Sequence, residues 1–208
     1  MLASVRNRRS FKEAKDRVKQ IVVDTYLPKD FPDSCAPEYL PFTVYALIGA
    51  TCTSSMMFLS TQSLFVALGG SSSQAQLAAA AYTWVLKDGI GQLGGILFAS
   101  RYGGYFDEDI KKWRYFAMVT LNISILIEIL TLKYPHLFLF LASTANMGKN
   151  ICFLMAAASR AQINMRFAKA NNIADIAGKS VSLFTTSSLL GMGIGIGLSK
   201  IIDISQLS

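Results

Sequence analysis

Long stretches with few or no charged residues alternate with short polar links along most of this sequence. The clearest apolar stretches are Phe42–Leu68, Tyr115–Leu132, Pro135–Ser159 and Ser180–Ser199. Each approaches or exceeds the roughly 20 residues that an α-helix needs to cross the hydrocarbon core of a bilayer. A further stretch, Gln74–Ala99, is Ala-rich and amphipathic. The pattern therefore predicts an all-α, multi-pass helical membrane protein with about five spanning helices.

The beginning of the chain has a different character. Residues 1–25 are strongly basic, which predicts a surface helix attracted to anionic headgroups, and they lack the apolar core of a cleaved signal peptide. No aromatic or Gly-rich RNA-binding signature accompanies the charge, so no nucleic-acid partner is expected. Residues 26–41 contain four prolines and predict an entry loop, because proline interrupts helices. Residues 42–208 then form the helical membrane domain.

Composition agrees with a membrane setting. The chain is 52% hydrophobic and 16% charged, whereas soluble domains carry about 25% charged residues. The cysteines, Cys35, Cys52 and Cys152, have no metal-binding or disulfide-framework spacing and are expected to be free thiols. His136 is the only histidine. The sequence thus shows no catalytic constellation, and neither an enzyme nor a cofactor nor a metal site is expected.

The polar links differ in charge, as the positive-inside rule requires. The N-terminus, Arg101–Arg114 and Arg160–Lys179 are rich in Lys and Arg and are expected on one side of the membrane. The Gly69–Ser73 turn, the Lys133 turn and the C-terminal tail carry little charge and are expected on the other side. This asymmetry is consistent only if Gln74–Ala99 also crosses.

Four ionisable residues fall inside the predicted spans. Lys87, Asp88 and Lys149 are expected near the midplane, and Glu128 closer to the side opposite the N-terminus. A lone charge at such depth costs about 2.5–3.5 kcal/mol, so these residues should pair or face a cavity. One interpretation is a polar pathway or binding site for a small solute. The other is a structural clamp between Asp88 and Lys149 that fixes the packing of the second and fourth helices.

Glycine spacing predicts close helix packing at two places. Gly91 and Gly95 share one helix face, and the fifth span has two overlapping pairs of the same spacing, Gly191 with Gly195 and Gly193 with Gly197. Such faces allow another backbone to approach closely. A G-x-G-x-x-G spacing also occurs within Lys87–Ala99, but no βαβ rhythm surrounds it, which argues against a dinucleotide site.

The stretch Lys87–Ala99, KDGIGQLGGILFA, resembles the signature of the root UVB sensitive family, whose plant members are linked to vitamin B6 homeostasis. The resemblance continues at Tyr26–Ser34 (YLPKDFPDS), Glu38–Phe42 (EYLPF) and Asn171–Asp175 (NNIAD), and it spans nearly the whole chain. Single positions that match the family pattern are Gly89, Gly94, Trp113, Arg114, Glu128, Pro135, Lys149, Arg160, Asn172 and Asp175.

The resemblance implies a plastid or other endomembrane location, association with a related family member, and a role in pyridoxal phosphate balance, photoprotection and early seedling development. Two positions depart from the family pattern, since Met118 and Asn122 stand where acidic residues are common. The family domain also usually continues into one further apolar helix, so the chain resembles a shortened member.

Two functions follow from these observations. The first is a transporter-like membrane protein that handles a small solute through Lys87, Asp88, Glu128 and Lys149. The alternative is a non-catalytic membrane scaffold that pairs with a relative, or with itself, through its glycine faces and basic links. An enzyme acting on a B6 vitamer is a poorer interpretation, because it would need a phosphate cradle or a Schiff-base lysine.

Overall fold

A computed structural model describes residues 16–69 and 74–202, with side chains from residue 78 onward in the second range. The described part is helical apart from turns and one isolated bridge between Cys35 and Ala168. A first helix covers residues 16–26. The elements that follow are α2 (Tyr39–Ala67), α3 (Gln74–Tyr102), the short 3-10 helix η1 (Gly103–Tyr105), α4 (Ile110–Lys133), the 3-10 helix η2 (Pro135–Leu137), α5 (Phe138–Phe167) and α6 (Ile173–Ser199).

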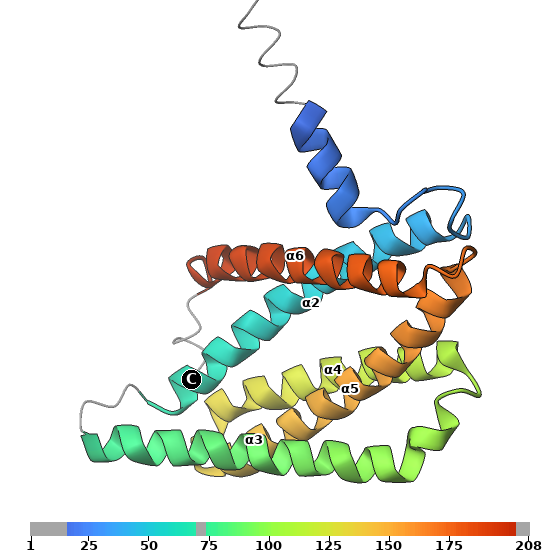
Figure 1. Ribbon diagram of the computed structural model, residues 1–208. Coiled ribbons are helices and arrows are strands. Elements are labelled where there is room, and N and C mark those ends of the chain that lie inside the picture. The colour runs from blue at the N-terminus through green and yellow to red at the C-terminus, as the bar shows by residue number, and fades with distance from the viewer. Residues whose placement is uncertain (1–15, 70–73, 203–208) are drawn as a thin grey trace, which may run out of the picture.

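The five long helices run in alternating directions (Figure 1). Helix α2 packs against α6 and α4, while α5 packs against α3 and α4. The links at residues 27–38, 103–109 and 168–172 lie at one end of the bundle, together with the helix over residues 16–26. We call this the basic end. It gathers the segments that the charge pattern groups on one side of a membrane.

The helix over residues 16–26 stands away from the bundle in Figure 1. Its apolar side chains Val18, Ile21 and Val22 are exposed, as a helix resting on a bilayer surface requires. The remainder of the expected basic surface helix, residues 1–15, lies outside the described residues.

Three helices extend further into the polar links than the apolar stretches indicate. Helix α2 begins at Tyr39 and includes Pro41 in its first turn, where no backbone N–H needs a partner. The entry loop therefore covers residues 27–38 rather than 26–41. Helix α4 begins at Ile110, because the Asp109 side chain caps it by accepting from Lys112 N at 3.1 Å. Helix α5 likewise continues beyond Ser159 to Phe167. Charged residues such as Arg160 end the apolar stretch in the sequence, but they do not end the helix.

The entry loop is tied to the end of α5. The backbone N–H of Ala36 donates to Phe167 O at 3.0 Å, and that of Lys169 donates to Ser34 O at 3.2 Å. The Tyr39 ring meets the Phe167 ring edge-on, with centroids 5.5 Å apart. These contacts fix the beginning of α2 against the end of α5 and close the basic end of the bundle.

Among the described residues, four helices are long and apolar enough to span a membrane: α2, α4, Pro135–Phe167 and α6. Many large apolar side chains also face outward, including Tyr45 and Phe140, as expected where the surface contacts lipid rather than water. Helix α3 is as long as α2, but Lys87, Asp88 and Arg101 lower its hydropathy. The fold is thus all-α with four apolar candidate spans, and the expectation of about five is not confirmed.

Candidate functional site in the helix bundle

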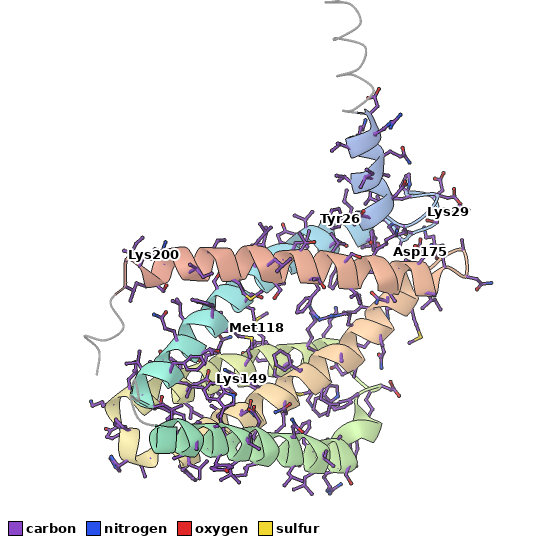
Figure 2. All side chains as sticks on the ribbon, turned by 60° about the vertical axis from the view of Figure 1, so that its left-hand side comes forward. Tyr26, Lys29, Met118, Lys149, Asp175 and Lys200 are labelled. Carbon is purple, nitrogen blue, oxygen red and sulfur yellow. The ribbon has the colours of Figure 1, made fainter. Side chains whose placement is uncertain are left out.

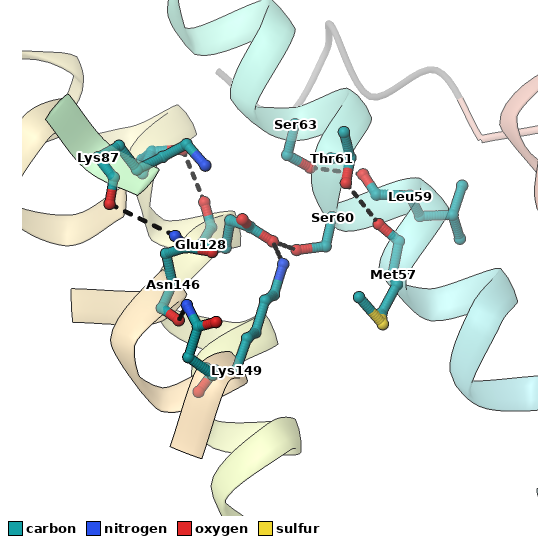
Figure 3. Close-up of polar contacts among 12 residues, drawn as sticks. Met57, Leu59, Ser60, Thr61, Ser63, Lys87, Glu128, Asn146 and Lys149 are labelled. Carbon is teal, nitrogen blue, oxygen red and sulfur yellow. Dashed lines mark hydrogen bonds and ion pairs between the residues drawn. The ribbon is translucent and has the colours of Figure 1, made fainter. Parts of the chain in front are cut away.

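Glu128 on α4 is the centre of a buried ion pair. Its carboxylate contacts Lys149 on α5, and the two residues are 2% and 5% exposed. The hydroxyl of Ser60 on α2 donates to the same carboxylate oxygen, Oε2 (Figure 3). One carboxylate therefore joins three helices.

The local sequence explains why this pair can form. Gly148, next to Lys149, lets α5 approach α4 closely, since a Cβ at that position would overlap the side chain of Ser124. One helical turn beyond Ser124, Glu128 then faces α5. The Thr131 hydroxyl donates to the Glu128 backbone carbonyl at 2.6 Å. Buried charges are tolerated when they are paired and hydrogen-bonded, and this pair meets both conditions inside the chain.

A second polar cluster lies where α3 meets α5. Lys87 Nζ is 2.5 Å from Asp88 Oδ1, and it also lies 4.5 Å from the centre of the Trp84 ring. Asn146 Nδ2 on α5 donates to Asp88 Oδ1 at 3.1 Å and to Lys87 O at 3.4 Å. Lys87 is buried, but the Asp88 side chain is 41% exposed. This cluster is open on one side, unlike the Glu128 pair.

The expected clamp between Asp88 and Lys149 is wrong. Lys149 pairs with Glu128, and Asp88 pairs with Lys87 and Asn146. The two clusters nevertheless adjoin, because Asn146 and Lys149 are one helical turn apart on α5 and share a face. We call the combined set the polar layer; its members are Ser60, Lys87, Asp88, Glu128, Asn146 and Lys149. Figure 3 labels all of them except Asp88.

Glycines on α3 bring the polar layer together. A Cβ at Gly91 would overlap the side chain of Asn146, and one at Gly94 would overlap Met147. At Gly95 a Cβ would lie 3.2 Å from Asn150 Cβ. This close approach places Asn146 within reach of Asp88.

The glycines of α6 are used in the same way against α2. A Cβ at Gly191 would overlap the backbone carbonyl oxygen of Thr51, and one at Gly195 would lie 3.0 Å from Phe58 Cβ. The Ser55 hydroxyl donates to Gly191 O at 2.8 Å across this contact. The face with Gly91 and Gly95 and the face with Gly191 and Gly195 are therefore filled within the chain, whereas the Cβ positions of Gly193 and Gly197 have nothing within 4 Å.

Comparison with known proteins gives a consistent result. A sequence model of the family described as "Vitamin B6 photo-protection and homoeostasis domain" matches residues 12–208. The chain belongs to this family. Protein root UVB sensitive 6 of Arabidopsis thaliana is 34% identical over 89% of the chain and 37% of its own length. RUS family member 1 of Dictyostelium discoideum is 32% identical over 88% of the chain and 35% of its own length.

The root UVB sensitive relatives include one whose name gives a compartment. Protein root UVB sensitive 2, chloroplastic, of Arabidopsis thaliana is 33% identical over 89% of the chain and 43% of its own length. The chain thus spans less than half the length of these relatives. No solved structure matches the chain.

Several positions of the root UVB sensitive pattern hold the basic end together. Asn172 Nδ2 donates to Ser34 O at 3.2 Å, and Asp175 Oδ2 accepts from the backbone N–H of Lys29 at 2.7 Å. Trp113 Nε1 donates to Tyr105 O at 2.7 Å. Figure 2 shows Lys29 and Asp175 close together beside the entry loop. Gly89 has nothing within 4 Å of its Cβ position, so packing does not explain that glycine.

Two further pattern residues, Arg114 and Arg160, are half-buried and lie beside aromatic rings. The departures from the family pattern fall elsewhere. Met118 and Asn122 are exposed on α4, and Asn122 Nδ2 donates to Met118 O of its own helix at 2.9 Å. These two departures leave the polar layer unchanged.

Sequence reasoning missed Ser60 and Asn146. Ser60 is one of eight Ser and Thr residues in α2, and four of the others bond to a carbonyl of their own helix, so nothing in the sequence distinguishes it. Asn146 could have been found, because an amide inside an apolar helix commonly hydrogen-bonds to a neighbouring helix.

Proposed function

We propose that this protein is a transporter-like membrane protein that moves a small solute and acts in vitamin B6 homeostasis without catalysing a reaction. The polar layer carries the proposal. Ionisable residues inside apolar helices are costly and typically mark substrate or ion pathways. Asp88 supports a pathway over a purely structural role, because its carboxylate is half-exposed while Glu128 is closed off.

The proposal includes a fifth crossing by α3. Its 29 residues would extend about 44 Å at 1.5 Å per residue, and it runs antiparallel to α2 and parallel to α5 within the bundle (Figure 1). Single cysteine reporters at Ser72, Asp107 and Pro135, in a cysteine-free background, test this. We expect the Asp107 reporter to label from one side of the membrane and the other two from the opposite side. Labelling of the Ser72 and Asp107 reporters from the same side would remove α3 from the spans, wherever the Pro135 reporter labels.

The transport role is tested by uptake into proteoliposomes, with radiolabelled pyridoxine and pyridoxal 5′-phosphate as probes. We expect Asp88→Asn to lower the initial rate by about tenfold or more, because the substitution removes the half-exposed charge of the polar layer. Glu108→Gln is the matched control, since that exposed carboxylate forms no ion pair within the described residues. Uptake that is intact in Asp88→Asn would refute the assigned site.

The name of one relative supports a plastid membrane as the place of action if the source is a plant. For the scaffold alternative, α5 and α2 occupy the faces of Gly91 and Gly95 and of Gly191 and Gly195, whereas the Cβ positions of Gly193 and Gly197 have nothing within 4 Å. That second face of α6 and the basic links are the features on which this alternative now depends.

A further inference from the structure

Two arginines near the basic end are held by aromatic rings rather than by acids. The guanidinium carbon of Arg114 on α4 lies 5.5 Å from the centre of the Phe42 ring on α2. That of Arg160 on α5 lies 4.5 Å from the centre of the Phe184 ring on α6. Both arginines are half-buried, and their charges lie within electrostatic range of each other. Four helices thus converge on a pair of like charges.

Within residues 16–69 and 74–202, no carboxylate forms an ion pair with either arginine. The ion pairs among the described residues join Lys87 to Asp88, Lys149 to Glu128 and Lys179 to Asp175. Within the same ranges neither guanidinium donates a hydrogen bond to a side chain or to the backbone. A contact with the face of a ring leaves the N–H groups at the edge of a guanidinium free. The pair therefore has unused positive charge and unused donors.

The position of the pair suits an anion that arrives from outside. Arg114 is about one turn from the beginning of α4, and Arg160 about two turns from the end of α5. Exposed basic residues lie at these helix ends, namely Lys111, Lys112, Arg166 and Lys169, and the exposed carboxylates Asp107, Glu108 and Asp109 precede α4. The attraction of an anion to this place therefore depends on the two arginines rather than on a surface of one charge sign.

We propose that Arg114 and Arg160 form a binding site for a phosphate group, carried either by a soluble phosphate ester or by a lipid headgroup. The planar guanidinium matches phosphate oxygens in a two-point geometry and is less strongly hydrated than an ammonium group. Two such groups without acids neutralise a phosphate dianion. This site is separate from the polar layer and does not depend on the proposed transport activity.

The first test uses the whole purified chain in a neutral, phosphate-free detergent and measures its melting temperature with inorganic phosphate against chloride at equal ionic strength. We expect saturating phosphate to raise the melting temperature by a few degrees. The rise should disappear in Arg114→Gln/Arg160→Gln. Arg101→Gln is the matched control, since Arg101 also lies beside a ring, that of Tyr102, but is exposed, and it should keep the full rise.

A second arm distinguishes the sources of phosphate. Phosphatidic acid, added as mixed micelles, replaces inorganic phosphate in the same measurement. An arginine-dependent rise with inorganic phosphate assigns the site to a soluble phosphate ester, and a rise with phosphatidic acid alone assigns it to a lipid headgroup. If neither probe gives a rise that depends on the arginines, the proposal is overturned.

A lysine variant keeps the test decisive if the glutamine variant does not fold. Arg114→Lys/Arg160→Lys retains both charges but loses the two-point geometry. Its phosphate-dependent rise should fall to less than about half that of the unmodified chain. An undiminished rise would show that general charge attraction, rather than this guanidinium pair, is responsible.

Discussion

Helix α5 carries two basic side chains in opposite circumstances, Lys149 and Arg160. Lys149 is buried against the Glu128 carboxylate, which Ser60 also contacts, so its charge is satisfied within the chain. Arg160 lies over the ring of Phe184, its charge acts on that of Arg114, and no carboxylate of the described residues forms an ion pair with it. The difference separates a charge that holds helices together from one that is available to a ligand.

The largest effect should come from removing Lys149. Lys149→Met leaves the buried Glu128 carboxylate without its counter-ion, and the loss of one member of a buried ion pair typically costs about 3–5 kcal/mol. Arg160→Met is the matched change on the same helix, and it should cost much less because no buried carboxylate is abandoned. Thermal and denaturant unfolding in detergent would measure both.

The double variant Lys149→Met/Glu128→Met sharpens this comparison. Replacing both partners of a buried pair with apolar side chains is often neutral or stabilising, so much of the lost stability should return. We call Lys149, which is paired with Glu128, the closed charge and Arg160, which has no ion-pair partner among the described residues, the open charge. If Arg160→Met destabilises the protein as strongly as Lys149→Met, this distinction is wrong.

The sequence predicted this contrast only in part. The apolar stretches predicted the positions of α2, α4, α5 and α6, because hydropathy depends only on which residues follow one another along the chain. Glu128 and Lys149 lie in these stretches, and the free-energy cost of burying a charge predicted that each would have a partner. The choice of partner was wrong for Lys149, because it depends on which helices are neighbours, and Gly148 against Ser124 sets the approach of α5 to α4.

The glycine spacing likewise did not predict which face of a helix meets its neighbour. The spacing identified helix faces on α6, but Gly193 and Gly197 repeat the spacing of Gly191 and Gly195. Only the rotation of α6 against α2 distinguishes them, since the Cβ positions of Gly193 and Gly197 have nothing within 4 Å.

An intermediate effect is expected at Ser60, which supports the closed charge from α2. Ser60→Ala removes a hydrogen bond to a buried carboxylate, and bonds to charged groups contribute about 1.5–3 kcal/mol. Ser63→Ala is the matched control, because Ser63 is also buried on α2 but donates to Leu59 O of its own helix at 3.1 Å. Equal losses of unfolding free energy in the two variants would mean that the Ser60 contact adds nothing to the ion pair.

The smallest of these effects concerns the contact between α2 and α6, on which both charged regions depend. Helix α2 contributes Ser60 to the closed pair, and α6 contributes Phe184 to the open one. Gly191→Ala places a methyl group against the carbonyl oxygen of Thr51, and such overpacking typically costs 1–3 kcal/mol. Gly193→Ala enters open space on the same helix, where replacing a helical glycine by alanine is favourable by about 0.5–1 kcal/mol.

The two substitutions should therefore shift the melting temperature in opposite directions. They lie two positions apart on one helix, but Gly191 faces α2 and Gly193 faces open space. A Gly191→Ala variant as stable as Gly193→Ala would show that α6 is not held at this distance from α2. The Phe184 ring would then not be fixed over Arg160. Arg160 would no longer be held in place from α6, while the ion pair of Glu128 and Lys149 would be unchanged.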